Sequence, residues 1–208
     1  MAPVVPPAPP ATPRTPTVHL ADRKTRAAFR AKVGEYARGA VGYIEGKGNL
    51  TPFGAWLGLN GLPWCISFVA YVYAAAAAAV GCENPLAGIQ TRKGPGGATE
   101  LARIGRARGW ALGRDETPMV GDLALWDHDA VDGGPGHGGI VVGVRQLPDG
   151  SLEVTTVEGN TSRSAKATKA EARNGGEVAV HRHTLAGGGR PSHGRFLVYL
   201  RPTRRFGR

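Results

Sequence analysis

The stretch GLPWCISFVAYVYAAAAAAVG, residues 61–81, constrains the fold of this chain more than any other segment. Its apolar residues need a protein interior, and Pro63 before the run and Gly81 after it are typical of a helix start and a helix end. We therefore predict a buried helix from about Trp64 to Val80. The run is too short and too rich in alanine to span a membrane.

The rest of the chain predicts helices first and strands later. Residues 21–45 carry apolar side chains at helical spacing, and residues 98–108 predict a third, shorter helix. After residue 118, five apolar or alternating runs are separated by glycine-rich turns, which is typical of antiparallel strands. The runs are DLALWD, GGIVVGVRQL, LEVTTVE, EVAVHRH and RFLVYLRP. The predicted fold is α+β, with N-terminal helices packed on an antiparallel sheet of about five strands.

Both ends of the chain differ in composition from the predicted domain, residues 20–201. Residues 1–17 hold seven prolines, so we expect residues 1–19 to form an extended arm that serves as a tether or a docking strand. Residues 202–208 are a basic tail. The start of the chain lacks the basic and apolar regions of a signal peptide. We therefore expect synthesis in a host cytoplasm and release by another route.

The charge of the chain is strongly positive, with a formal net charge of +10 at pH 7. Such a charge attracts polyanions, whether nucleic acid, an anionic lipid surface or a bacterial wall. The charge alone does not indicate which of them is the partner. The basic residues are not interleaved with aromatic ones as in a single-strand binder, and no nucleic-acid-binding module is recognisable. We expect no specific nucleic-acid partner.

Cys65 stands at the start of the predicted helix, where the first backbone N–H groups have no partner within the helix. The positive end of the helix favours a thiolate, and the N–H of Cys65 is a ready donor to an oxyanion. The alternative is a small buried core cysteine. Cys82 follows the end of the helix, about 24 Å away, so we expect no disulfide between the two.

His137 is the histidine best placed to serve as a base for this thiol. It opens an apolar strand in GGPGHGGIVVGV, where small neighbours leave room for a substrate beside the ring; the alternative is an ordinary turn histidine. The next strand, LEVTTVEGNTS, ends in Glu158 and Asn160. If the two strands pair in antiparallel fashion, these side chains lie beside His137 and either could orient its imidazole.

Four segments, PWCISFVAYV, VGDLALWD, GHGGIVVGV and VEGN, resemble in order and spacing the CHAP domain, the cysteine- and histidine-dependent amidohydrolase/peptidase of the papain-like clan. The resemblance covers about residues 35–200. It implies Cys65 as nucleophile, His137 as base, Glu158 as third member and Asn160 as polar helper. It also implies hydrolysis of an amide bond in bacterial peptidoglycan, either the N-acetylmuramoyl-L-alanine bond or a peptide bond, with no cofactor.

Three further residues are candidates for substrate binding in a CHAP-like site. Trp56 and Trp64 are expected to line the groove for the stem peptide or glycan, with core packing as the alternative for each. Asn60, just upstream of the nucleophile, is a candidate second donor to the oxyanion.

The chain departs from the family pattern at two places. Val120 replaces the proline of the family's P-G-D turn, whereas the glycine and aspartate remain. Some relatives carry an aspartate-rich calcium loop upstream of the cysteine, but EGKGNLTPFGAWLGLNG has no Asp and one Glu, so we expect no metal there. Three aspartates further on lack the other ligands of a calcium loop and are expected to belong to a hairpin loop; they are Asp127, Asp129 and Asp132.

Two uses of such a domain remain open. One is a phage lysin, free or carried in the virion, whose proline-rich arm attaches it to other virion or tail proteins. The other is a structural or docking component of a phage particle with a CHAP-like fold and little activity. Usage rich in Ala, Gly and Arg is typical of a phage of high-G+C bacteria.

Overall fold

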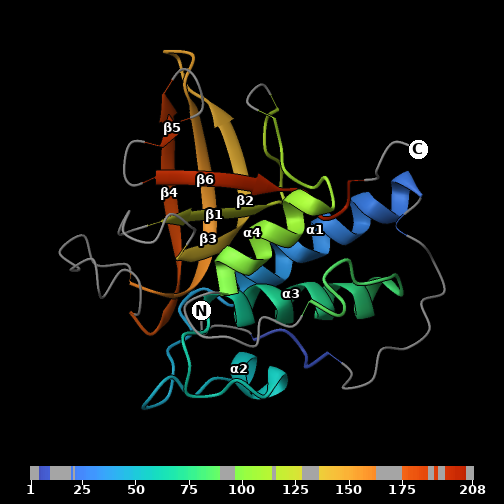
Figure 1. Cartoon of the computed structure of the whole chain (residues 1–208), viewed down its shortest axis with the longest axis vertical. Coiled ribbons are helices and arrows are strands. Elements are labelled where there is room, and N and C mark those ends of the chain that lie inside the picture. The colour runs from blue at the N-terminus through green and yellow to red at the C-terminus, as the bar shows by residue number, and fades with distance from the viewer. Residues whose placement is uncertain are drawn as a thin grey trace.

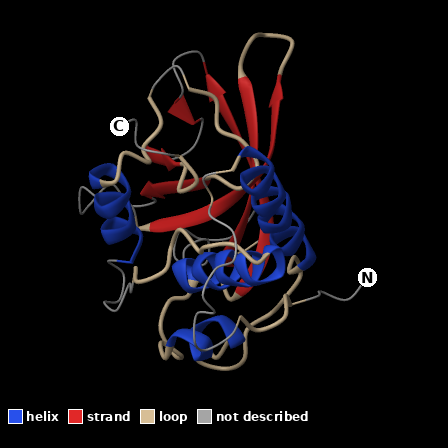
Figure 2. Ribbon diagram, turned by 90° about the vertical axis from the view of Figure 1, so that its right-hand side faces the viewer, coloured by secondary structure: helices blue, strands red, loops and turns tan. Residues whose placement is uncertain are grey.

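The computed structural model describes residues 5–9, 20, 22–89, 97–113, 116–127, 136–162, 175–186, 190–191 and 195–204. Within these residues four helices precede six strands, which confirms the α+β prediction (Figures 1 and 2). The helices are α1 (Arg23–Gly39), α2 (Pro52–Leu57), α3 (Cys65–Val80) and α4 (Gly97–Ala107). The strands are β1 (Leu123–Asp127), β2 (His137–Gln146), β3 (Leu152–Thr161), β4 (Glu177–Ala186), β5 (Arg190–Pro191) and β6 (Arg195–Leu200).

Helix α3 is the centre of the fold and matches the predicted helix closely. Twelve of its 16 residues are buried. It ends at Gly81, whose φ of 72° is the left-handed conformation that glycine adopts at low cost. At the other end, the N-cap Trp64 makes no side-chain hydrogen bond to the first turn. The first backbone N–H groups of α3 are therefore not used by a capping side chain.

The prediction of one helix over residues 21–45 is wrong at its C-terminal end. Helix α1 ends at Gly39, and Gly42 has a φ of 90°, which a continuing helix cannot accommodate. The chain then runs along the start of β4: Gly42 N donates to Val178 O at 2.8 Å, and Val178 N donates to Tyr43 O at 2.9 Å. Sheet hydrogen bonds thus replace the helical ones that the apolar spacing predicted.

Helix α2 was not predicted, although its sequence carries start and stop signals. Thr51 is the N-cap and its side chain accepts a hydrogen bond from Gly54 N at 2.9 Å. Pro52 occupies the first turn, and Gly58 closes the helix with a φ of 69°. Six residues are too few to show the spacing of apolar side chains that is typical of a helix, so the sequence pattern does not predict one here.

The sheet has the order β5-β4-β3-β2-β1-β6, and all of its neighbouring strands are antiparallel. Strands β1 and β6 run across the view of Figure 1 while β3 and β4 run along it, so the sheet is strongly twisted. Helices α1 and α3 lie side by side and pack on β2. The main core fills the space between α3 and the sheet, and a smaller apolar cluster around Trp126 and Tyr199 lies on other strand positions.

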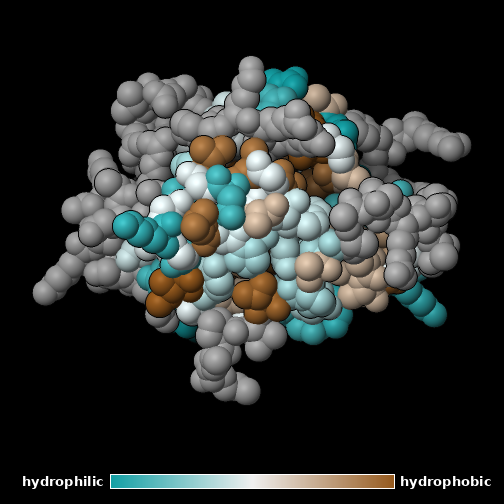
Figure 3. All heavy atoms as spheres, turned by 90° about the horizontal axis from the view of Figure 1, so that it is seen from below, coloured by the Kyte–Doolittle hydropathy of each residue, from teal (hydrophilic) through white to brown (hydrophobic). Residues whose placement is uncertain are grey.

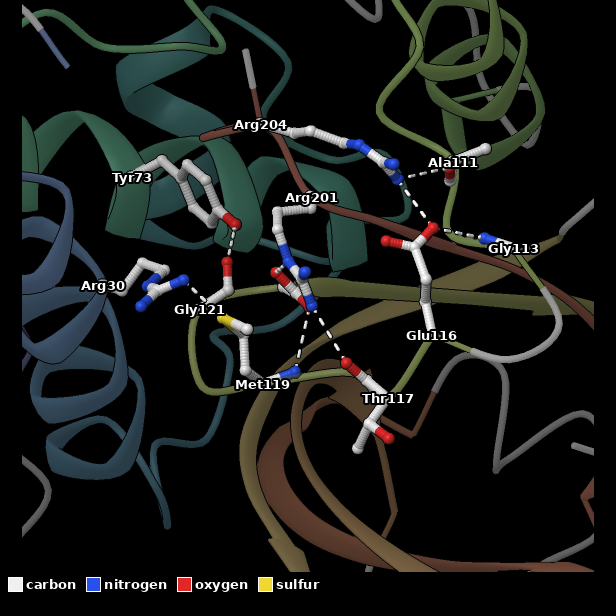
Figure 4. Close-up of polar contacts among 11 residues, drawn as sticks. Arg30, Tyr73, Ala111, Gly113, Glu116, Thr117, Met119, Gly121, Arg201 and Arg204 are labelled. Atoms are coloured by element: carbon white, nitrogen blue, oxygen red, sulfur yellow. Dashed lines mark hydrogen bonds and ion pairs between the residues drawn. The ribbon is translucent and has the colours of Figure 1, made fainter. Parts of the chain in front are cut away.

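The turn before β1 is fixed by a buried charge. Asp122 is fully buried and accepts hydrogen bonds from two nitrogens of Arg201, from Nη2 to Oδ2 at 2.8 Å and from Nε to Oδ1 at 3.1 Å and Oδ2 at 3.2 Å. Burial raises the pKa of Asp122, and the contact with Arg201 opposes that rise. Figure 4 shows the surroundings: Arg201 also donates to Thr117 O, and Tyr73 of α3 donates to Gly121 O. The Gly-Asp pair of the VGD segment therefore joins the C-terminal segment to the central helix.

Part of the proline-rich arm packs on the domain. Pro6 and Pro9 are buried, and Tyr71 Oη donates to Pro6 O at 3.0 Å. Residues 5–9 therefore dock on α3. The boundary of the arm at residue 19 stays a prediction, because residues 1–4 and 10–19 lie outside the described residues. The same holds for the tail, of which residues 202–204 are described.

We predict that Arg201→Ala lowers the free energy of unfolding by about 3 kcal/mol at pH 7, because it leaves a buried carboxylate without its partner. The loss should be smaller at pH 4. A carboxyl group whose pKa is raised by folding stabilises the folded state below its unfolded pKa, and this contribution disappears as the pH rises through the folded pKa. Urea unfolding at both pH values measures the effect.

The control is Arg204→Ala. Arg204 pairs with Glu116 at 2.7 Å on the surface, where both side chains are over one-third exposed and the pair contributes little. Equal losses for the two variants would contradict the assignment of Asp122 and Arg201 as the main ion pair of this region.

Candidate active site

Cys65 and His137 meet where the start of α3 faces the start of β2. Cys65 is the first residue of α3 and is buried; His137 is the first residue of β2 and is fully buried. The Cys65 thiol lies close enough to the imidazole to raise the pKa of His137. Two residues that are 72 positions apart in the sequence are thus in contact, as the pairing of nucleophile and base requires.

Glu158 contacts the same imidazole at Nε2. Its Oε2 lies 3.2 Å from His137 Nε2, and both side chains are buried. Because Glu158 occupies Nε2, Nδ1 is the ring nitrogen left for proton exchange with Cys65. The antiparallel register of β2 and β3, with Ile140 opposite Val157, produces this contact and confirms the predicted strand pairing.

The pKa values of the buried pair follow from these contacts. Burial by itself lowers the pKa of His137, but the hydrogen bonds and charges of Cys65 and Glu158 raise it to about 10. Burial raises the pKa of Glu158, but its hydrogen bonds with two histidines hold it well below the usual range. The favoured state is therefore an imidazolium next to a carboxylate.

The family profile of the CHAP domain matches residues 58–160. The chain contains a CHAP domain. No curated protein and no solved structure shows significant similarity to the chain. The match begins just after α2 and ends at Asn160, so it includes Cys65, His137 and Glu158. CHAP domains are cell-wall amidases or peptidases, typically cysteine-dependent, and this is the class of activity that the match implies.

Three glycines of the CHAP motifs allow the close packing around the site. A Cβ on Gly139 would lie 2.7 Å from Glu158 Cγ and 2.9 Å from Val157 O. A Cβ on Gly159 would lie 2.6 Å from Trp64 Cζ3. Gly138 is equally crowded, since its Cβ would lie 2.5 Å from Leu125 Cδ2. The GHGG and EGN segments therefore need glycine so that β2, β3 and α3 can approach one another.

Asn160 lies in a bulge of the CHAP domain. It is fully buried with a φ of 57°, and the pairing of β3 with β4 shifts register between Glu158 and Thr161. Asparagine tolerates this left-handed conformation better than most residues. The bulge follows directly after Glu158, as bulges often do beside active sites. The predicted role of Asn160 as a polar helper stays a prediction.

The residues predicted to bind substrate take different positions. Trp64 is fully buried: its Nε1 donates to Glu45, and its ring stacks on Phe53 with centroids 5.4 Å apart. Its ring therefore packs in the core, and substrate binding by Trp64 stays a prediction.

Trp56 and Asn60 also have structural contacts of their own. Trp56 is half-buried and packs edge-on against Tyr71, with ring centroids 5.7 Å apart. Asn60 is exposed, and its Oδ1 accepts a hydrogen bond from Thr51 N at 2.9 Å. Substrate binding by Trp56 and oxyanion binding by Asn60 stay predictions.

Sequence reasoning missed two histidines of β4 that contact Glu158. His183 Nε2 lies 3.2 Å from Glu158 Oε1, and His181 Nε2 lies 3.9 Å from Glu158 Oε2. The HRH pattern of a polar strand places both imidazoles on one face. Only the register of β3 with β4 brings that face to Glu158. The sequence pattern does not predict this register.

The described residues include no group of three or more His, Cys, Asp or Glu side chains arranged to hold a metal ion. Asp129 and Asp132 lie outside the described residues, as does the side chain of Asp127, so the predicted hairpin loop is not observed. Among the helices that the structure describes, none is long and apolar enough to cross a membrane.

Large apolar side chains exposed on the described surface are few. Three of them precede α3, namely Ile44, Leu50 and Leu62, and the fourth is Val180 of β4. Figure 3 shows apolar residues on the underside of the molecule in several separate groups. Scattered apolar residues are normal on a soluble surface, so this distribution does not define a docking face.

We predict that Gly139→Ala lowers the free energy of unfolding by about 1–3 kcal/mol, because the added methyl group forces apart β2 and β3. It should also displace Glu158 from His137 and lower the rate of wall lysis. Gly143→Ala on the same strand is the matched control, since its Cβ would lie 3.6 Å from Thr155 Cβ, an ordinary contact. Urea unfolding that shows the same stability for both variants would contradict this account of the GHGG segment.

Proposed function

We propose that the protein hydrolyses an amide bond of bacterial peptidoglycan through a thioester on Cys65, with His137 as general base and acid and Glu158 as its orienter. The observation that carries the proposal is the buried series of contacts from the Cys65 thiol through the His137 imidazole to the Glu158 carboxylate. The CHAP match at residues 58–160 supports the cell wall as the source of the substrate.

In the first step the proton shared between the thiol and His137 stays on the imidazole, as the raised pKa of His137 favours, and the sulfur attacks the carbonyl carbon of the amide. The electron pair of the C=O bond moves to oxygen. The backbone N–H of Cys65 is a donor for this oxyanion, because it belongs to the first turn of α3 and no side chain caps that turn. Loss of the amine follows, with its proton supplied by His137.

In the second step water hydrolyses the thioester. His137 Nδ1 takes a proton from water, the oxygen of water bonds to the acyl carbon, and the sulfur leaves and recovers the proton from His137. The net reaction adds one water to one amide and gives a carboxylic acid and an amine. Glu158 keeps its proton-free state throughout, since its low pKa favours the carboxylate.

The positive charge of the chain supports action at the wall. A net charge of +10 attracts the enzyme to a wall that carries phosphates and carboxylates. This attraction weakens as salt screens it. The bond cut is either the N-acetylmuramoyl-L-alanine bond or a peptide bond of the stem or cross-bridge.

We also propose that the enzyme is encoded by a phage and carried in its particle. What supports it is the proline-rich segment 1–17 and the composition rich in Ala, Gly and Arg. Particles of such a phage should contain the protein when they are washed in high salt and analysed by mass spectrometry. Its absence from washed particles, together with its presence in the lysate, would indicate a free lysin instead.

Substitutions at Cys65, His137 and Glu158 should reduce the rate of hydrolysis to different extents, according to the role of each residue. Cys65→Ala and Cys65→Ser should abolish hydrolysis, because no nucleophile remains, and His137→Ala should nearly abolish it. Glu158→Gln should cost less, since the amide oxygen can still accept a hydrogen bond from His137 Nε2. Mass spectrometry of purified peptidoglycan after digestion measures the loss and identifies the bond that is cut.

Cys82→Ala is the matched control for the thiol. Cys82 is buried at the end of α3 and burial raises its pKa to about 11, so its thiol is unreactive near neutral pH. This variant should keep full activity. Hydrolysis by a folded Cys65→Ala variant at the parent rate would exclude the proposed mechanism.

A further inference from the structure

The Glu158 carboxylate has contacts on both of its oxygens. Oε2 contacts His137 Nε2 at 3.2 Å, and Oε1 accepts a hydrogen bond from Thr156 Oγ1 at 2.6 Å. Oε1 also lies 3.2 Å from His183 Nε2. His183 Nε2 is in turn 3.1 Å from Thr156 Oγ1. Three polar atoms thus form a triangle at Oε1, on the side of the carboxylate remote from His137.

The single hydroxyl hydrogen of Thr156 determines which group donates in the contact between Thr156 and His183. Because that hydrogen is donated to Glu158 Oε1, the oxygen of Thr156 can only accept from His183. The carboxylate oxygen is also only an acceptor. His183 Nε2 therefore carries a hydrogen, and it faces two acceptors. The carboxylate receives hydrogen bonds from both ends: from His137 at Oε2 and from the Thr156–His183 pair at Oε1.

Packing holds the two imidazoles in place. The ring of Trp126 contacts both, with its centroid 5.2 Å from that of His137 and 5.1 Å from that of His183. Trp126 is buried, and the side chain of His183 is 19% exposed. The aromatic ring therefore limits rotation of both histidines.

From this geometry we propose that His183 is a positioning residue of the active site: its Nε2–H holds Glu158 Oε1, so that Oε2 stays directed at His137 Nε2. The inference rests on the proposed function and extends it from three residues to a fourth on β4. With Nε2 of His137 held by Glu158, Nδ1 is left for proton exchange with Cys65. A displacement of Glu158 would leave the imidazole free to rotate and would lower the stability of the imidazolium.

His181 provides a comparison within the same strand. It has the same side chain, lies two residues away and shares the face of His183. Its Nε2 is 3.9 Å from Glu158, beyond hydrogen-bond range, and 3.1 Å from Thr161 Oγ1. Its side chain is also more exposed, at 27%. A role that depends on the hydrogen bond to Glu158 belongs to His183 and not to His181.

The experiment compares His183→Ala, His183→Gln and His181→Ala in the full-length protein. NMR of the ring nitrogens of isotope-labelled histidine gives the titration of His137, whose pKa is raised to about 10. His183→Ala should move this titration to lower pH, because Glu158 is no longer held against the imidazolium. His183→Gln should restore the parent titration, since its amide nitrogen can donate from a similar position. His181→Ala should leave the titration nearly unchanged.

Kinetics on solubilised peptidoglycan give a second readout. His183→Ala should lower kcat by roughly tenfold or more with little change in KM, as for other residues that orient a catalytic group. His183→Leu, which fills the site but cannot donate, replaces the alanine variant if circular dichroism shows that the latter is unfolded.

The proposal is overturned if neither variant that lacks the donor changes the titration of His137, or if His181→Ala has an equal effect. It is also overturned if only KM changes. The NMR titration needs no substrate, so its outcome is independent of the proposed function. If Cys65→Ala still hydrolysed peptidoglycan, the function would be wrong while a shifted titration would still establish the positioning role.

Discussion

The contact between the buried Glu158 carboxylate and the buried His137 imidazole is the interaction on which the site depends. Each group alone would be costly inside the protein. Together they stabilise an imidazolium and a carboxylate, which is why the pKa of His137 is raised while that of Glu158 is lowered. The glycines next to both residues allow the strands to approach closely enough for the contact. The thiol then needs only to be placed within reach of the other ring nitrogen, Nδ1.

Helix α3 places that thiol at its first residue, and its start carries no capping side chain. A capped helix would use its first N–H groups for the cap, whereas here they remain as donors to a developing negative charge. The buried length of the helix fixes the position of Cys65, and the ion pair of Asp122 with Arg201 fixes the turn that leads into β1. The architecture thus joins the start of a buried helix to the start of an inner strand of the sheet, and the chemistry lies where they meet.

The sequence predicted the parts of this arrangement that local signals encode. Pro63 and Gly81 gave the bounds of α3, and the order of four short motifs gave the family and the pairing of β2 with β3. What it could not predict depends on contacts between distant segments. The residues after Gly39 have helical spacing but pair with β4 instead. The contact of His183 with Glu158 forms only when β4 pairs with β3 in the observed register.

The central claim is that Cys65 forms a covalent acyl intermediate with the substrate, and trapping that intermediate tests it most directly. Enzyme mixed with a soluble peptidoglycan fragment is quenched in acid within the first turnovers and digested, and the peptides are analysed by mass spectrometry. The account predicts an added acyl fragment on the peptide that contains Cys65, and none on the peptide that contains Cys82. Hydrolysis that proceeds without any adduct on Cys65, or an adduct on Cys82 alone, would contradict it.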